Sequence, residues 1–281
     1  MSFLKPSDKL NRIEASGISP SAGFSFLEIT HRDGMGKKLR ILGVIPARYD
    51  STRLPGKVLK NIAGKPMIYW VFKNARKAAV LSDLLVATDS EKVLRYCEGE
   101  KIPVILTGRH PSGTDRLREV MDRVEADVYI NIQGDEPTLR PEHLDAVVAP
   151  FLREDVRVQV STLKVAIEES QAQDPNKVKV VTDDSGRALY FSRYPIPFDR
   201  ESAGVKRYKH LGIYAYTKAA LTLFHSLPES SLELAEKLEQ LRFLQNGVEI
   251  YVVETPYDTV GVDTQEDLER VELMFSGAKH P

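Results

Sequence analysis

The stretch RILGVIPARYDSTRLPGKVL (40–59) joins an apolar, strand-like run to a basic loop. Residues 40–47 are apolar through most of their length, which is typical of a strand buried on both faces of a parallel sheet. The loop carries Arg48, Arg53 and Lys57 among prolines and a glycine that restrict its backbone. Three cations in such a loop indicate a site for a negatively charged group, the alternative being a solvated basic turn.

Strand-like and helix-like segments alternate after this junction. Apolar side chains recur with helical spacing in residues 64–79 and 114–126. Further strand-like runs occupy residues 83–89, 103–107, 127–133 and 158–166. Strand and helix in alternation predict an α/β fold with a mainly parallel central sheet and flanking helices.

The rhythm changes after about residue 175. Two short strands flank Asp-Ser-Gly at 184–186, which predicts a hairpin. A strand is expected at 210–217, a helix at 231–247, a strand at 249–254 and a helix at 264–275. We therefore expect one α/β domain over residues 40–275 that carries a smaller antiparallel insertion.

The two ends of the chain carry no clear pattern. Residues 1–39 lack periodicity, and we expect a disordered extension there, with Met35 as an alternative start and a short ordered arm as the competing interpretation. Residues 276–281 are expected to form a tail.

Composition excludes several classes of partner. Lys and Arg number 39 against 40 Asp and Glu, so the net charge of −1 argues against nucleic acid and against anionic membranes. We find no apolar run of the roughly 18–20 residues that a membrane helix needs. Cys97 is the single cysteine, which excludes an internal disulfide and favours a buried structural thiol in a reducing, cytoplasmic setting.

Two acidic motifs follow predicted strands or turns. Asp135 lies in NIQGDEP (131–137), at the end of a strand, and Asp263 lies in TVGVDTQEDL (259–268), just before a capping-box pattern. Mg²⁺ prefers one or two carboxylates and takes its other oxygens from phosphates and water. The motifs favour a magnesium site, with Glu136 as the next candidate ligand; a plain turn and a plain helix start are the alternatives.

A third motif, HPSGTDRL (110–117), places Ser112 and Gly113 at a predicted helix start. Such a start can hold a phosphate or a nucleobase, or can be a simple N-cap. The P-loop pattern is absent, and no G-x-G-x-x-G follows a strand, so kinase and dehydrogenase interpretations lose their main support.

These motifs together resemble the 3-deoxy-manno-octulosonate cytidylyltransferase (CMP-Kdo synthetase) family. IPARYDSTRLPGKVL, HPSGTDR, NIQGDEP, ALYFSR, KHLGIYAY, EKLEQLR and VDTQEDLE occur in the family's order and span about 40–275. The resemblance implies a cytoplasmic homodimer that uses Mg²⁺ to transfer CMP from CTP to the sugar acid Kdo for lipopolysaccharide synthesis.

The resemblance also implies roles for individual residues. CTP is expected to contact Ala47, Arg48, Arg53, Lys57, Ser112, Gly113 and Asp135. Catalysis is expected from Arg53, Lys57 and Asp135, and metal binding from Asp135 and Asp263. The sugar acid is expected to contact Gln133, Arg193, His210, Tyr214, Glu236 and Gln240. Arg193 and His210 are the candidate cations for its carboxylate, while Glu236 and Gln240, four residues apart, are expected on one helix face.

Other functions remain open at this stage. The substrate is Kdo or a related acid such as 8-amino-Kdo or sialic acid, although sialic-acid enzymes have a more glycine-rich basic loop. A non-catalytic nucleotide-binding regulator is a second alternative. A metal-dependent glycosyltransferase is less well supported, because the Asp-x-Asp pair typical of such enzymes does not occur in this chain.

Overall fold

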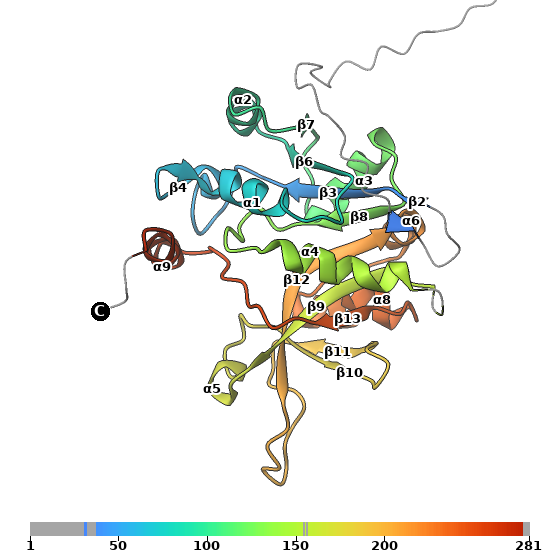
Figure 1. Cartoon of the computed structure of the whole chain (residues 1–281). Helices are drawn as coiled ribbons and strands as arrows, with labels where there is room; N and C mark the ends of the chain where they lie inside the picture. Colours follow the sequence, from blue (N-terminus) through green and yellow to red (C-terminus); the bar gives the residue numbers. More distant parts are fainter. Residues whose placement is uncertain (1–30, 33–37, 154, 156, 278–281) are drawn as a thin grey trace, which may run out of the picture.

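A nine-stranded sheet forms the centre of the molecule in the computed structural model, which describes residues 31–32, 38–153, 155 and 157–277 (Figure 1). Its parallel part has the order β8-β3-β6-β7. These strands are β3 (Ile41–Pro46), β6 (Asp83–Thr88), β7 (Val104–Leu106) and β8 (Val128–Asn131). The predicted α/β fold with a mainly parallel central sheet is confirmed.

The first strand of this part, β3, is buried on both of its faces. Ile41 and Ile45 belong to one hydrophobic cluster, whereas Leu42 and Val44 belong to another on the opposite side of the sheet. The first cluster includes side chains of α1 (Met67–Ala75), α2 (Glu91–Gly99) and α4 (Pro141–Val148). The second includes side chains of α3 (Gly113–Arg123), α6 (Lys218–Ser226) and α8 (Leu241–Gln245). Helices therefore cover both faces, as the apolar strands require.

A long strand, β12 (Arg207–Thr217), joins the parallel part to an antiparallel part. β9 (Val160–Ile167) pairs along one side of β12, and β13 (Tyr251–Glu254) continues the sheet beyond β9. On its other side β12 pairs with β8 near its end and with β10 near its start. The predicted hairpin is present as β10 (Lys179–Thr182) and β11 (Ala188–Ser192).

Short elements complete the described structure. Two 3-10 helices occupy Lys57–Leu59 (η1) and Ala149–Leu152 (η2). The remaining elements are β4 (Asn61–Ile62), β5 (Lys65–Pro66), α5 (Glu169–Ala172), α7 (Ser231–Glu236) and α9 (Gln265–Phe275). No helix in the described part of the chain is both long and apolar enough to cross a bilayer.

The prediction of one helix over residues 231–247 is wrong, because the structure has two helices there, α7 and α8. Lys237 adopts a left-handed conformation, with φ 54° and ψ 48°, which ends α7 before α8 begins. The leucines of this segment differ in burial as a result: Leu238 and Leu241 are buried, but Leu234 is 47% exposed. Glu236 and Gln240 therefore do not share one helix face.

Two short strands precede β3 in the described residues. Within the expected extension, β1 (His31–Arg32) pairs with β2 (Lys38–Leu39), and Leu39 is buried in the first hydrophobic cluster. Residues 1–30 and 33–37, including Met35, lie outside the described residues, as do 278–281 of the expected tail.

Candidate functional site

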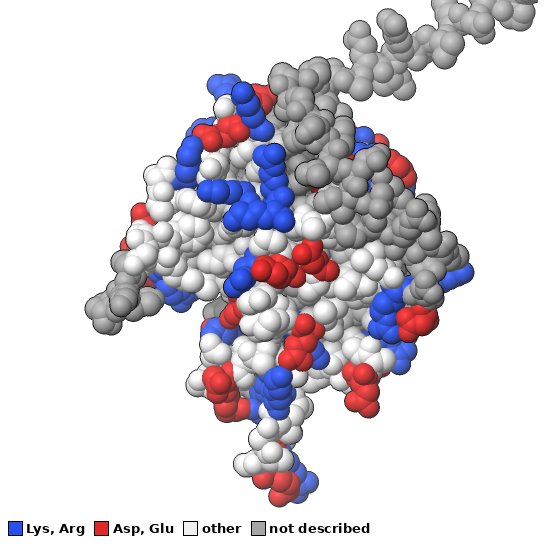
Figure 2. Space-filling view, in the orientation of Figure 1, with Lys and Arg blue, Asp and Glu red and all other residues white. Residues whose placement is uncertain are grey.

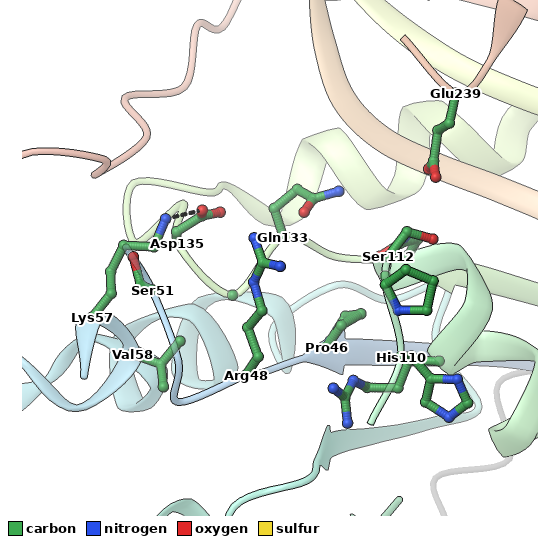
Figure 3. A pocket seen from close by; sticks show the side chains of 15 residues that line it. Pro46, Arg48, Ser51, Lys57, Val58, His110, Ser112, Gln133, Asp135 and Glu239 are labelled. Atoms are coloured by element: carbon green, nitrogen blue, oxygen red, sulfur yellow. Dashed lines mark hydrogen bonds and ion pairs between the residues drawn. The ribbon is translucent and has the colours of Figure 1, made fainter. Parts of the chain in front are cut away.

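A pocket of about 320 Å³ opens at the carboxyl ends of β3 and β8 (Figure 3). Ligands of open α/β sheets bind at this edge, and the volume is within the range of small-molecule sites. Six of the predicted residues line it: Arg48, Lys57, Ser112, Gly113, Gln133 and Asp135. Arg48 rises into its middle, with Lys57 and Asp135 on one side and Ser112 and His110 on the other (Figure 3).

Close packing of two strand ends forms the floor of this pocket. β3 and β8 are parallel neighbours in which Val44 pairs with Asn131. The loop after β8 then passes so near β3 that a Cβ atom on Gly134 would lie 2.7 Å from the carbonyl oxygen of Pro46. Glycine is needed here because of this approach, and it brings Asp135 beside the basic loop.

A turn within the basic loop sets the direction of Lys57. Gly56 has φ 67°, and its N–H donates to the carbonyl of Tyr49 at 3.2 Å. The Lys57 N–H donates to the carbonyl of Leu54, whose side chain is buried. This folded turn fixes where the Lys57 side chain starts.

Four predicted residues converge at one end of the pocket. Nζ of Lys57 lies 2.5 Å from Asp135 Oδ2 and 3.0 Å from Asp263 Oδ1, and Arg53 contacts the other oxygen of Asp263 at 3.1 Å. Burial works to lower the pKa of Lys57, but the two carboxylates outweigh it and raise that pKa above its ordinary value. Lys57 is therefore a fixed positive charge at this end.

The two aspartates form a donor set suited to Mg²⁺. Thr264, and not Asp263, caps α9 together with Asp267, so the Asp263 carboxylate is left to face the basic loop. Both carboxylates already surround one cation, the Lys57 ammonium group. Across the described residues no cluster of three or more His, Cys, Asp or Glu is arranged to hold a metal. Two carboxylates suffice for Mg²⁺ when phosphates and water supply the remaining oxygens.

Glu136, the alternative ligand, is in a different environment. Its Oε2 atom is buried and has no hydrogen-bond partner among the described residues. Burial, reinforced by the neighbouring Asp135, raises the pKa of Glu136 to about 7, although Lys209 opposes this. The side chain is not among those that line the pocket.

The opposite end of the pocket is built around the start of α3. The Ser112 hydroxyl accepts from the Asp115 N–H and so caps the helix, as the plain N-cap interpretation expects. A Cβ on Gly113 would lie 3.3 Å from the amide nitrogen of Asn131, so glycine lets this amide approach the helix start. Ser112 and Gly113 nevertheless both line the pocket.

Several lining residues were missed by the sequence analysis. They are Pro46, Ser51, Val58, His110, Pro111, Arg116, Asn131, Gly134 and Glu239. Glu239 accepts a hydrogen bond from Thr114 at 2.6 Å, and burial raises its pKa. The EKLEQLR motif contains Glu239, but an unbroken helix would not have identified it as the residue that faces the pocket.

The predicted sugar-site residues are only partly brought together. Gln133 lines the pocket and donates from Nε2 to the carbonyl of Gly212 at 2.9 Å. Arg193 donates instead to backbone carbonyls of Pro175, Glu236 and Lys237. The Glu236 carboxylate accepts from the Ser192 hydroxyl and the Arg193 N–H. Neither Arg193 nor Glu236 lines the pocket.

His210 and Tyr214 are buried on β12. The His210 ring packs between Phe191 and Tyr214, and its Nε2 lies 3.0 Å from the Thr162 hydroxyl. Burial lowers the pKa of His210 to about 3, with a further contribution from Lys209. Burial favours the neutral imidazole, which argues against His210 as the positive charge for the sugar carboxylate. Its contact with a sugar remains a prediction.

Two further predicted residues are not among those that line the pocket. Gln240 is buried at the start of α8. Ala47 is also buried, and its carbonyl accepts from the Thr88 hydroxyl at 2.6 Å.

Comparisons with known proteins find similar sequences along most of the chain. A sequence model of the cytidylyltransferase family matches residues 42–250. The 3-deoxy-manno-octulosonate cytidylyltransferase of Acidobacterium capsulatum is 54% identical over 239 residues, which cover 84% of this chain and 97% of that protein. The enzyme of the same name from Geobacter sulfurreducens is 46% identical over 246 residues, covering 83% and 98%.

Two solved structures are also similar to this chain. A CMP:2-keto-3-deoxy-manno-octonic acid synthetase complexed with CTP is similar with a TM-score of 0.82 and 44% identity, covering 85% of this chain and all of that one. A putative glucose-1-phosphate thymidylyltransferase from Bacillus anthracis has a TM-score of 0.58 at 18% identity, covering 86% and 97%, and shows the fold alone.

Proposed function

The chain belongs to the 3-deoxy-manno-octulosonate cytidylyltransferase family, and from this premise we propose that it transfers CMP from CTP to Kdo and releases pyrophosphate. The product is the activated sugar used for lipopolysaccharide synthesis. One observation in the structure carries the proposal: Lys57, Asp135 and Asp263 meet at the end of a pocket beyond β3 and β8.

The cations of the basic loop are placed to bind the triphosphate of CTP. Arg48 and Lys57 line the pocket, and Arg53 lies at its rim beside Asp263. A hydroxyl oxygen of the sugar forms a bond to the α-phosphorus of CTP while the bond to the pyrophosphate oxygen breaks. Negative charge grows on the leaving pyrophosphate, and cations fixed before the reaction stabilise that charge in the transition state.

Asp135 and Asp263 would hold Mg²⁺, which would neutralise phosphate charge and orient the triphosphate. With Mg²⁺ between the two carboxylates, Nζ of Lys57 would contact the phosphate oxygens in their place. The flexible four-carbon stem of Lys57 allows this change of contact, whereas the turn at Gly56 keeps its origin fixed.

The other end of the pocket is assigned to the nucleoside and the sugar. Ser112 and Gly113 would contact the nucleoside from the start of α3, and Gln133 would contact sugar hydroxyls. His210, as a neutral hydrogen-bonding group, and Tyr214 lie on β12, whose Gly212 carbonyl accepts from Gln133. Three other predicted sugar residues would have an indirect role: they would hold the segment that places Glu239 at the pocket. They are Arg193, Glu236 and Gln240.

We further propose that the chain works as a homodimer in the cytoplasm. The segment 193–206, between β11 and β12, projects from the body as an arm (Figure 1). Tyr194 is 75% exposed and Phe198 is 83% exposed on this arm. Its stem is largely uncharged below the mixed charges of the body (Figure 2). Such side chains are typical of a surface that another protein covers.

Pyrophosphate release tests the proposed function directly. Purified protein with Mg²⁺ should release pyrophosphate from CTP in the presence of Kdo, and much less from ATP, GTP or UTP. Parallel assays with 8-amino-Kdo and sialic acid identify the preferred acid by kcat/KM. Binding of CTP without pyrophosphate release for any of these acids would support a non-catalytic regulator instead.

A further inference from the structure

The hydroxyl of Thr162 contacts three groups of β12 at once. Thr162 is fully buried on β9, and its Oγ1 lies 3.1 Å from the Leu211 carbonyl, 2.8 Å from the Ile213 carbonyl and 3.0 Å from His210 Nε2. These contacts lie on either side of Gly212, whose carbonyl accepts from the pocket residue Gln133.

The pairing of β12 with β9 is irregular at this point. Leu211 pairs with Leu163, but the next pair is Tyr214 with Thr162, so Gly212 and Ile213 have no partner on β9. Bulges of this kind redirect the backbone and leave ladder groups unpaired. Here the Gly212 carbonyl turns away from the ladder and accepts from Nε2 of Gln133.

Counting protons assigns the direction of these hydrogen bonds. A threonine hydroxyl has one proton, which it donates to a carbonyl of the bulge, and the shorter contact is to Ile213. The imidazole then has to donate, so Nε2 of His210 carries a proton and its Nδ1 is an acceptor. In the opposite tautomer Nε2 would be a third acceptor beside the Leu211 and Ile213 carbonyls, and the hydroxyl has only one proton to donate.

We propose that Thr162 is a positioning residue for the sugar acid: it holds the β12 bulge and fixes His210 in the Nε2–H tautomer. Through the Gly212 carbonyl the bulge orients the Gln133 side chain, so that its carboxamide oxygen accepts from sugar hydroxyls. The inference rests on the proposed assignment of Gln133 and His210 to the sugar.

The neighbouring residue offers a matched control. Ser161 is also fully buried on β9, but its hydroxyl has no hydrogen-bond partner among the described residues. Ser161 and Thr162 point to opposite faces of the sheet, since side chains alternate along a strand. Removing the Ser161 hydroxyl should therefore change neither substrate constant.

Steady-state kinetics separate positioning from folding. Thr162→Val keeps the side-chain shape without the hydroxyl, and it should raise KM for Kdo about tenfold while KM for CTP stays within about twofold. Thr162→Ser restores the hydroxyl and should recover most of the loss. Ser161→Ala should match the wild type. If Thr162→Val does not fold, Thr162→Ala takes its place.

The tautomer has its own readout. In protein with ¹⁵N-labelled histidine, NMR correlations should show His210 as Nε2–H in the wild type and in Thr162→Ser, and a changed tautomer balance in Thr162→Val. A His210→Asn variant assigns the signals. An Nδ1–H imidazole in the wild type would overturn the inference.

Kinetic outcomes distinguish the remaining failures. A Thr162→Val variant that melts earlier but keeps both KM values would make Thr162 merely structural. If Gln133→Ala leaves KM for Kdo unchanged, the sugar assignment fails and the inference fails with it. Absence of pyrophosphate release by the wild type with every acid would overturn the proposed function, while the tautomer measurement would still report on Thr162.

Discussion

The carboxylates of Asp135 and Asp263 meet at a single atom, Nζ of Lys57, at 2.5 and 3.0 Å. Asp135 follows β8, and Asp263 precedes α9 near the end of the chain. Two acids this close would repel each other without an intervening cation. The ammonium group thus keeps the acidic pair assembled in the protein without nucleotide.

Replacement of either aspartate by asparagine should abolish most activity. Asp135→Asn and Asp263→Asn keep the side-chain size but remove the charge that Mg²⁺ needs. Excess Mg²⁺ should restore little, and the double variant should be far from additive because both residues serve one step. Pyrophosphate release over a Mg²⁺ titration measures this, with the exposed Asp122→Asn as control. Retained kcat in Asp263→Asn would leave Glu136 as the second ligand.

The two cations of the basic loop should differ in importance. The Lys57 side chain is 13% exposed between the aspartates, whereas that of Arg53 is 62% exposed. Lys57→Ala should lower kcat by about 10²–10³-fold, as for loss of one fixed electrostatic contact, and Arg53→Ala by less. Arg76→Ala, an exposed cation after α1, serves as control in the same assay. Near wild-type kcat in Lys57→Ala would argue against a role on the phosphates.

Gly134 should not tolerate a side chain. The Cβ of Gly134→Ala would lie 2.7 Å from the Pro46 carbonyl, so the two strand ends would have to separate. We expect a lower melting temperature and reduced activity. Gly99→Ala is the matched control, because nothing lies within 4 Å of its added Cβ and alanine favours the helix by about 0.5–1 kcal/mol. Equal melting temperatures for the two variants would contradict this packing.

Glu136 should make the stability of the protein depend on pH. Its pKa is about 7 in the folded chain, against an ordinary value of 4.5. Between these values the folded state keeps the proton and the unfolded state has lost it, so stability falls as pH rises from about 4.5 to 7. The total effect is about 3 kcal/mol.

Urea unfolding at several pH values, without metal or nucleotide, measures this effect. Glu136→Gln should flatten the dependence, while Glu272→Gln, on the exposed surface of α9, should keep it. An identical pH dependence in the wild type and Glu136→Gln would show that this carboxyl is not responsible.

Much of the fold follows from local sequence patterns. The apolar residues of β3 predict burial on both faces, and the motifs after β3 and β8 predict where the pocket opens. The capping pattern at Thr264 likewise predicts the start of α9. These features depend on periodicity and turn chemistry, which a short window of sequence contains.

The missed features depend on contacts between distant segments. The charge of His210 depends on its burial between β9 and β11. The β12 bulge depends on its contacts with Thr162. The break at Lys237 lies in a run of good helix formers, and lysine is not a residue that marks a left-handed turn. It is held by Arg193, whose guanidinium donates to the Glu236 and Lys237 carbonyls.

Replacement of Lys237 by glycine should therefore stabilise the protein. A non-glycine residue in the left-handed region costs roughly 1–2 kcal/mol, which glycine does not incur. Lys237→Gly should raise the free energy of unfolding by about 1 kcal/mol and leave kcat and both KM values unchanged, because Arg193 contacts only the backbone here. Lys237→Val, with a β-branched side chain, should instead destabilise the break between α7 and α8. Since Glu239 lies two residues after Lys237 and lines the pocket, Lys237→Val should also reduce activity. Urea unfolding and steady-state kinetics of both variants test these expectations. A stabilising valine would mean that the segment prefers the continuous helix and that the break is not needed to place Glu239.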